Sequence, residues 1–356
     1  MSAVPTYPGV YISEQDGAVI SVNSAATCVP IFAVGGADSN TKDLFDTATR
    51  IYSWLDWLNK KGDKTKLDYL EDKVLRSYFE NGGGPCYVVA VASMATQVPD
   101  FADITLLVAS GLDISKAVRT LCVDGSGLFA ILDGPQTQIT STYDPSTSYT
   151  ANPDAAVYYP WILTSWSTDP VPPSGAIAGV YCSTDRTRGV WKAPANVALK
   201  GGVQPEFLVS DDLQSHFNTG LAINMIRNLD SRGAVVWGAR TLQGSDAYWQ
   251  YISVRRLFNS AQKDIQAAMN SWVTQPNYQP TWAKVGAAIS NYLYGLWQRG
   301  ALVGKTEAEA YFVDIGTDTM TQADIDAGKL IAKVGMAAVR PAEFIFLKFT
   351  SAVNQT

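Results

Sequence analysis

The residue types that carry enzyme chemistry are few and scattered in this sequence. His216 is the single histidine among 356 residues, so a histidine-based triad would depend on it alone. It lies in the stretch LQSHFNTGL, which predicts a helix with a structural histidine, and the serines near it lack the flanking glycines of a nucleophile elbow. Asp211, Asp212 and Glu343 supply carboxylates, but no pair of them sits in a short acid–base motif. We therefore expect no catalytic residue and no histidine-rich metal site.

Two further segments could indicate a nucleotide cofactor, and neither has the required pattern. The GGGPC run at 82–86 stands between an expected helix and an expected strand. A phosphate-binding loop has its glycines in front of a helix, followed by Lys and Ser or Thr. The crossover at 109–112 also lacks G-x-G-x-x-G. We expect no cofactor, and a nucleotide-binding α/β enzyme stays as an alternative that a calorimetric nucleotide screen without binding would exclude.

The most unusual stretch is PPSGAIAGVYCSTDRTRGVWKAPAN, at 172–196. Its small residues permit a close approach of two backbones, and Asp185, Arg186 and Arg188 place opposite charges within a few residues. Trp191 follows as a rigid apolar tip. A catalytic loop would need a nucleophile and a base, which are missing. We therefore expect a structural turn that is held by a buried Asp–Arg pair.

The elements that would position these residues follow from the apolar periodicity. Apolar residues at i, i+3, i+4 and i+7 predict helices, and short apolar runs between glycines predict buried strands. In the first half, strands are expected at 27–36, 86–92, 104–109 and 128–132, with helices at 51–61, 67–80 and 113–121 and a polar surface loop at 136–153. The strand–helix–strand order from 104 to 132 indicates a parallel sheet with helices on its faces.

The second half continues the alternation of strands and helices. We expect strands within 155–166 and at 234–241 and 310–315, helices at 211–230, 281–298 and 321–334, and at 248–257 either a strand or a lead-in to a helix near 258–273. Thr321 and Asp324 form the N-terminal capping box of the helix at 321–334. The whole chain is therefore expected to be an α/β protein.

Both ends of the chain are apolar and resemble strands, whereas most termini are polar. The first is PTYPGVYISEQ at 5–15, and the last is PAEFIFLKFTSAV at 341–353. An exposed apolar strand invites aggregation unless another sheet pairs with it. Addition to a neighbour's sheet would satisfy its backbone and dock alternate side chains. The residues expected to do this are Val10, Tyr11 and Ile12 at the front, and Phe344, Ile345, Phe346, Leu347 and Phe349 at the back.

Composition narrows the class of protein. Hydrophobic residues make up 47% and charged residues 17%, and ten Trp with 17 Tyr hint at subunit interfaces. The net charge of −6, without a block of Lys or Arg, argues against nucleic acid and an anionic membrane as partners. We expect no membrane insertion, no signal peptide and synthesis in a cytoplasm that keeps the four scattered cysteines reduced.

Several blocks of the sequence resemble the contractile tail sheath family. They are YPGVYISE (7–14), YFENGGGPCYVVAV (78–91), AAVYYPWI (155–162), the 172–196 stretch, VVWGARTL (235–242), YISVRRLF (251–258), GALVG (300–304), EAYFVDIG (309–316) and RPAEFIF (340–346). They follow the family order over nearly the whole chain. The compact length is most similar to sheath subunits of extracellular injection systems of the antifeeding-prophage type. Departures such as Ser110 and Phe217 leave open whether this is the main sheath subunit or a minor one.

The resemblance implies a two-domain subunit with mixed sheets and two exchange arms. It implies an N-terminal arm at 1–22, an outer α/β domain at 23–154, an inner sheath core at 155–341 and a C-terminal arm at 342–356. The arms would pair with neighbouring copies in hexameric rings that stack helically around an inner tube. A baseplate and a terminal cap would close the particle, which would be released from the bacterium.

The resemblance also implies a surface toward the tube. Sheath families place a basic helix near the end of the chain, so Lys329, Lys333 and Arg340 are the expected tube contacts. A solvated helix face is the alternative interpretation of these three residues. Contraction would drive the tube through a target cell envelope without any enzyme activity. A minor sheath, cap or baseplate-proximal subunit of the same particle would share these motifs.

Overall fold

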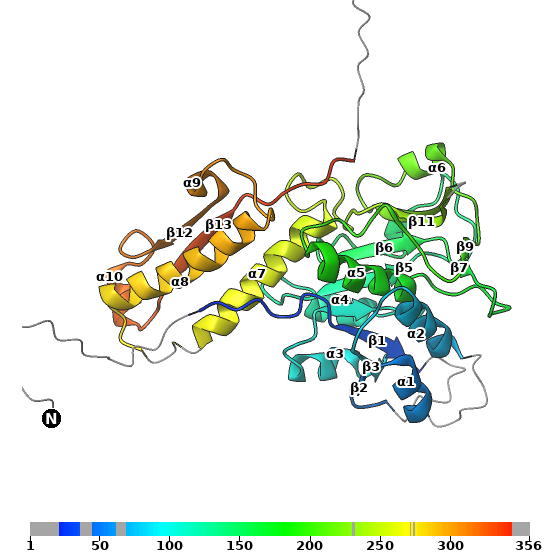
Figure 1. Cartoon of the computed structure of the whole chain (residues 1–356), viewed down its shortest axis with the longest axis horizontal. Helices are drawn as coiled ribbons and strands as arrows, with labels where there is room; N and C mark the ends of the chain where they lie inside the picture. The colour runs from blue at the N-terminus through cyan, green and yellow to red at the C-terminus, as the bar shows by residue number, and fades with distance from the viewer. Residues whose placement is uncertain are drawn as a thin grey trace, which may run out of the picture.

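The computed structural model describes residues 21–35, 45–61, 69–229, 232–270, 272 and 275–343. One large sheet with helices on both faces forms most of the structure, and a smaller unit with two long helices projects from it (Figure 1). We call the described residues up to 251 the sheet body and residues 252–343 the side unit. The α/β class with a mixed sheet flanked by helices is confirmed.

The sheet has nine strands in the order β2-β3-β1-β4-β5-β6-β10-β11-β8. The pairs from β3 through β1, β4, β5 and β6 to β10 are parallel, and β2, β11 and β8 join antiparallel. The strands are β1 (Pro30–Val34), β2 (Thr49–Ile51), β3 (Cys86–Ala90), β4 (Leu106–Val108), β5 (Phe129–Asp133), β6 (Ala155–Tyr159), β8 (Val197–Ala198), β10 (Ile223–Leu229) and β11 (Gly233–Trp237). A separate two-stranded sheet pairs β7 (Ile162–Leu163) with β9 (Gln204–Pro205).

The helices of the sheet body cover both faces of the large sheet. One apolar cluster joins one face to α1 (Trp54–Lys60), α2 (Leu70–Glu80) and α5 (Ser174–Arg188). A second cluster joins the other face to α3 (Met94–Gln97) and α4 (Ser115–Leu121). Because the parallel strands are buried on both faces, they are continuous apolar runs, which is why the sequence identified them readily. The short helix α6 (Asp211–Ser215) and the 3₁₀ turns η1 (Val98–Asp100) and η2 (Pro145–Thr147) complete the body.

The side unit consists mainly of two long helices and a hairpin-like sheet. It contains α7 (Ile252–Asn270), α8 (Gln279–Gln298), α9 (Glu307–Ala310), β12 (Tyr311–Ile315), α10 (Gln322–Asp326) and β13 (Ala332–Met336). A third apolar cluster fills it, with α8 residues packed against α7 and β12. In Figure 1, α7 lies between the sheet body and the rest of this unit. None of the described helices combines the length and the apolar character that a membrane crossing requires.

Most of the expected elements of the first half are present, whereas several in the second half differ from the expectation. The expected helix at 211–230 ends after α6 at Ser215, and β10 follows, because its apolar run fits between β6 and β11. The 172–196 stretch contains the helix α5 instead of a turn. At 248–257 the helix α7 begins at Ile252, so the alternative of a strand is excluded.

The sheet continues across the boundary that the resemblance implied at residue 154. β5 and β6 lie on either side of that position and pair in parallel from Ala130↔Ala155 to Asp133↔Tyr158. Residues 23–154 and the first part of 155–341 therefore share one sheet. The visible division of the described chain falls near residue 252, where α7 begins.

Helices α2 and α5 cross at very short range because α5 carries glycines at its contact face. A Cβ on Gly179 would lie 2.5 Å from the carbonyl oxygen of Tyr78, and one on Gly175 would clash with that of Val74. The small residues of the 172–196 stretch thus permit the close backbone approach that the sequence indicated.

Replacement of Gly179 by alanine should destabilise the subunit by about 1–3 kcal/mol, because the helices must move apart. Gly295 on α8 is the matched control, since a Cβ there meets nothing within 4 Å. Gly295→Ala should be neutral or stabilise by up to about 1 kcal/mol. Urea unfolding of both variants measures the difference, and an equal effect at the two positions would contradict the close packing.

Candidate functional site

Two consecutive arginines on α7 connect the side unit to the sheet body. The Arg255 guanidinium donates to both oxygens of Asp154, from Nε at 2.7 Å and from Nη2 at 2.8 Å. One turn later, Asn259 donates to the same carboxylate at 2.6 Å. Asp154 stands directly before β6 and is 1% exposed, so this bidentate pair is buried at the sheet. Arg255 also reaches the exposed Asp124 at 3.1 Å.

Arg256 makes a second buried pair with a different element. It donates to the two oxygens of Asp185 on α5 at 3.0 and 2.7 Å, and to the carbonyl of Thr27 at 3.0 Å. The Thr27 hydroxyl donates to Asp185 at 2.6 Å, and the Tyr181 ring lies 4.7 Å below the guanidinium. Burial alone would lower the pKa of Arg256, but the adjacent Asp185 carboxylate outweighs it and raises the pKa. The guanidinium therefore stays charged and ties three segments together.

The first described residues of the chain run along the contact between α7 and the sheet body, which we call the joint. The backbone N–H of Ala25 donates to Asp264 of α7 at 3.0 Å, and the Tyr292 hydroxyl of α8 donates to the other oxygen at 2.7 Å. Burial raises the pKa of Asp264, although both hydrogen bonds act against this. Val22 packs against the apolar cluster of the side unit. The segment at 21–27, which we call the N-terminal root, is thus fixed to α7, α8 and α5.

The last described residues are fixed by another arginine. Arg240 follows β11, and its Nη2 donates to Glu343 at 2.5 Å while its Nε contacts both carboxylate oxygens at 3.2 Å. Arg240 also donates to the carbonyls of Asn218 and Gly244, and its own N–H donates to Asn224. Burial lowers the pKa of Arg240, but the Glu343 carboxylate raises it overall. Residues 340–343, the C-terminal root, are therefore tied to the sheet body.

The expected structural turn was partly wrong. Asp185 does form a buried Asp–Arg pair, but its partner is Arg256 rather than Arg186 or Arg188, which are exposed at the last turn of α5. Arg186 is adjacent in sequence and therefore points to a different side of the helix. Arg188 has a spacing that would allow a pair, but both oxygens of Asp185 face inward and accept from Arg256. Arg186 instead donates to the carbonyl of Gly82 at 3.3 Å. Trp191 follows the helix and lies 5.4 Å from the Arg299 guanidinium.

Sequence reasoning missed Arg255, Arg256 and Asp154 as interacting residues. The available signal was the pair of arginines inside YISVRRLF, an otherwise apolar run in which charges need buried partners. Their partners, Asp154 and Asp185, lie far away in the sequence, so local spacing does not indicate the contacts.

The expected basic helix toward the tube was also wrong. Helix α10 has the expected capping box between Thr321 and Asp324, but it ends at Asp326. Gly328 follows with φ of 72°, a conformation that favours glycine, and the chain then turns into β13. Lys329 pairs with Asp324 at 3.2 Å. Lys333 lies on β13 opposite Asp314, with its ammonium 5.9 Å from the Phe312 ring. Arg340 belongs to the C-terminal root, so the three cations do not share one helix.

The sheet of the side unit has two strands within the described residues. β12 and β13 pair antiparallel from Tyr311↔Met336 to Ile315↔Ala332. Beyond β13, one bridge joins Leu302 to Ala338. In the part of the chain that the structure describes, the outer edges of β12 and of residues 332–336 have no further strand beside them. Such edges present backbone groups that an added strand can pair with.

The residues expected to exchange strands lie outside the described residues. They are Val10, Tyr11, Ile12, Phe344, Ile345, Phe346, Leu347 and Phe349. Their role stays a prediction.

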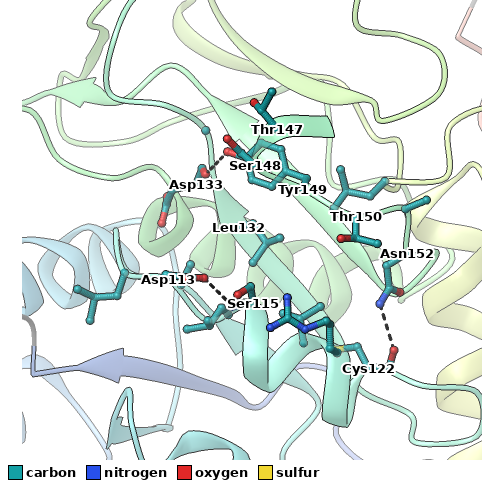
Figure 2. Close-up of a pocket in the computed structure, with 18 of the residues that line it drawn as sticks. Asp113, Ser115, Cys122, Leu132, Asp133, Thr147, Ser148, Tyr149, Thr150 and Asn152 are labelled. Carbon is teal, nitrogen blue, oxygen red and sulfur yellow. Dashed lines mark hydrogen bonds between the residues drawn. The ribbon is translucent and has the colours of Figure 1, made fainter. Parts of the chain in front are cut away.

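A hollow of about 710 Å³ lies at the carboxyl ends of β4 and β5, beside α4 and the loop at 146–152 (Figure 2). The Asp133 carboxylate at its edge accepts from the N–H groups of Gly111 and Ser174 at 2.7 Å and from the Ser174 hydroxyl at 2.8 Å. Burial raises the pKa of Asp133 to about 6, against the effect of these bonds. Tyr149 donates to the Asp133 carbonyl at 2.8 Å. These groups hold the crossover loop onto α5, which is a structural task.

Several known proteins are similar to this chain in sequence or structure. The family model for the phage tail sheath C-terminal domain matches residues 244–351. The tail sheath protein of Vibrio phage KVP40 is 25% identical over 185 residues, which are 51% of this chain and only 26% of that protein. A cryo-EM structure of the PVC sheath complex of an extracellular contractile injection system, in the contracted state, matches with a TM-score of 0.90 and 54% identity over 99% of each chain. A chain of the anti-feeding prophage baseplate in the contracted state matches with a TM-score of 0.88 and 46% identity, over 97% of this chain and 99% of that one.

Replacement of Asp185 by asparagine should destabilise the subunit by about 3–5 kcal/mol, because it leaves the charge of Arg256 buried without a counter-charge. Asp124→Asn is the matched control, since the Asp124 side chain is 96% exposed beside Arg255. That change should cost less than about 1 kcal/mol. Denaturant unfolding compares them, and a small effect at Asp185 would show that the buried pair is not what holds the joint.

Proposed function

The chain belongs to the contractile tail sheath family, and we propose that it polymerises around an inner tube and drives that tube through a target cell envelope when the sheath contracts. It is a structural subunit of the sheath of an extracellular contractile injection particle. The observation that carries this conclusion is the match over 99% of both chains to the PVC sheath at 54% identity. The finer points, namely the inner tube, the cap, the arms, synthesis in the cytoplasm and the absence of enzyme activity, are our proposals.

Strand exchange is proposed to join the subunits. The N-terminal arm at 1–22 and the C-terminal arm at 342–356 would add strands to a sheet of a neighbouring copy. The open edges of the β12–β13 sheet are suitable acceptors among the described residues. Each added backbone hydrogen bond contributes about 0.5–1.5 kcal/mol. A few such bonds per arm would offset part of the conformational entropy that the arm loses when it becomes ordered. The contacts that fix the N-terminal and C-terminal roots support this proposal, because they transmit a force on either arm to the rest of the subunit.

Contraction is proposed to need no substrate. The extended sheath would be a kinetically trapped state that is built on the tube and baseplate, and the contracted sheath would have the lower free energy. The buried joint of α7 favours a subunit that moves as one body, with the conformational change confined to the arms. We propose that residues 23–154 face outward and the later residues face the tube, with six copies in each ring.

Lys329, Lys333 and Arg340 remain our proposed tube contacts, now as charges on a turn, a strand and the C-terminal root. Lys329 is 62% exposed at its side chain despite the pair with Asp324. Lys333 and Arg340 are also exposed. Exposed cations of this kind would attract an acidic surface on the tube and set the register of docking. A solvated face is the alternative for these residues.

A minor sheath, cap or baseplate-proximal subunit is a second candidate, because two matched structures are of a baseplate. Negative-stain microscopy of the purified chain distinguishes the two. A main sheath subunit should form long hollow tubes, whereas a terminal subunit should form only rings or stay monomeric.

Deletion of residues 1–15 or of 343–356 should leave a folded subunit that no longer forms tubes, because the proposed exchange strands are lost while the sheet body is intact. Cooperative thermal unfolding, measured by circular dichroism, is the control for folding. The 1–15 deletion should melt close to the full chain, whereas the 343–356 deletion also removes Glu343 from Arg240 and should melt at a lower temperature. Tubes of normal length from either deletion, seen by microscopy, would exclude exchange by that arm.

Reversal of Lys329, Lys333 and Arg340 to glutamate should weaken co-assembly with the inner tube about tenfold at low salt, and high salt should narrow the difference. Reversal of the exposed residues Lys116 and Arg119 on α4 is the matched control and should have little effect. Co-sedimentation of subunit with preformed tubes measures both. Equal loss in the two variants would contradict a specific contact.

A further inference from the structure

Two thiols meet beside the N-terminal root. Cys28 immediately follows that root and lies just before β1, whereas Cys182 is on α5. Their sulfur atoms are 2.7 Å apart, although 154 positions separate them in sequence. The Tyr78 hydroxyl lies 3.5 Å from the Cys182 sulfur. The other two cysteines, Cys86 and Cys122, are buried and have no such partner within hydrogen-bond distance among the described residues.

The surroundings hold both sulfurs in place. On the N-terminal side of Cys28, the carbonyl of Thr27 accepts from Arg256 at 3.0 Å. On its other side, the N–H of Val29 donates to the Thr105 hydroxyl at 2.8 Å. Cys182 lies in a buried stretch of the long helix α5. A disulfide needs sulfurs about 2.05 Å apart, so bond formation requires only a small approach of these two atoms.

Both thiols line the same hollow, with Cys182 the more buried of the two. This hollow has a volume of about 850 Å³, and the end of α5 and Arg299 of the side unit also line it. Cys28 is half-buried rather than enclosed. The pKa of the Cys182 thiol is lowered, chiefly by the hydrogen bond with Cys28. The hydrogen bond with the Tyr78 hydroxyl also lowers this pKa, whereas burial raises it. A thiol with a lowered pKa is the one that attacks first.

We propose that Cys28 and Cys182 are a site of reversible oxidation, at which a disulfide fastens the N-terminal root to α5. The oxidant is a small disulfide such as oxidised glutathione. The Cys182 thiolate attacks one sulfur of it, forms a mixed disulfide and releases one glutathione thiolate. The Cys28 thiol then loses its proton and attacks the Cys182 sulfur, which releases the second glutathione. Two protein thiols and one small disulfide become one protein disulfide and two small thiols, so electrons and protons balance.

A disulfide between Cys28 and Cys182 would fix the point at which the N-terminal arm leaves the subunit. In the reduced protein the N-terminal root is held only by non-covalent contacts, to Asp264, Asp185 and Arg256. A disulfide at Cys28 would add a covalent link beside them. Reducing conditions inside a cell and oxidising conditions outside would make this a change at release, and that setting rests on the proposed function. The chemistry of the pair does not rest on it.

The test measures thiols in the purified full chain, so that its result is distinct from success or failure of assembly. Cys122→Ser makes the tryptic assignment unambiguous, since Cys28 falls in the peptide 1–42 and Cys182 in 120–186, which also holds Cys122. After incubation with oxidised glutathione, acid quenching and alkylation in denaturant, this variant should add one N-ethylmaleimide instead of three. The peptides 1–42 and 120–186 should appear linked, and dithiothreitol should separate them.

Two variants complete the test. In Cys28→Ser, Cys182 has no protein thiol with which to form a disulfide. After incubation with oxidised glutathione, Cys182 should therefore either react with N-ethylmaleimide or carry a glutathione. Cys86→Ser should retain the linked peptides. Oxidation should also raise the melting temperature of the wild-type chain and leave that of Cys28→Ser unchanged. Three alkylated thiols in oxidised Cys122→Ser, or a linkage that involves Cys86, would overturn the proposal.

Discussion

The structure depends on two buried guanidinium groups, those of Arg255 and Arg256 at the start of α7. Consecutive residues of a helix point about 100° apart, so the two side chains leave α7 in different directions. Arg255 reaches Asp154 before β6, and Arg256 reaches Asp185 at the end of α5. Each carboxylate receives two parallel hydrogen bonds, a geometry that fixes orientation as well as distance. Because the two ion pairs hold α7 from two directions, they fix its position relative to the sheet body.

The same joint explains how the chain ends are held. Asp185 also binds Thr27, and Asp264 of α7 binds Ala25, so the N-terminal root is part of the joint. Glu343 is bound by Arg240 at the other end of the described chain. Both arms of the proposed exchange therefore start from points that are fixed to a well-packed body. This arrangement suits a protein whose neighbours pull on its ends, because force is carried by ion pairs and packed helices rather than by loose loops.

The sequence was sufficient for the features that depend on local pattern. The apolar runs of β1, β3, β4, β5 and β6 stand out because strands buried on both faces contain few polar residues. Patterns failed where tertiary context decides. The run that forms β10 is compatible with a helix, and only its place between β6 and β11 makes it a strand. The partner of Asp185 was out of reach, since 71 positions separate it from Arg256 and local spacing carries no information about such a contact.

Gly328 illustrates a different kind of failure. The capping box correctly marked where α10 begins, but the helix was extended through the glycine to Val334, and Gly328 in fact ends it. The basic residues after it were therefore assigned to a helix face that does not exist. All three residues are exposed, although only Lys333 lies on the two-stranded sheet, and their contact with the tube stays a prediction.

The central claim is that the sheet body and the side unit move as one body while the arms absorb contraction. Cryo-electron microscopy of sheaths assembled from this chain, in the extended and the contracted state, tests it most directly. We predict that the Arg255–Asp154 and Arg256–Asp185 contacts are present in both states and that α7 keeps its place on the sheet. A rotation of α7 relative to the sheet that breaks either contact on contraction would contradict the account.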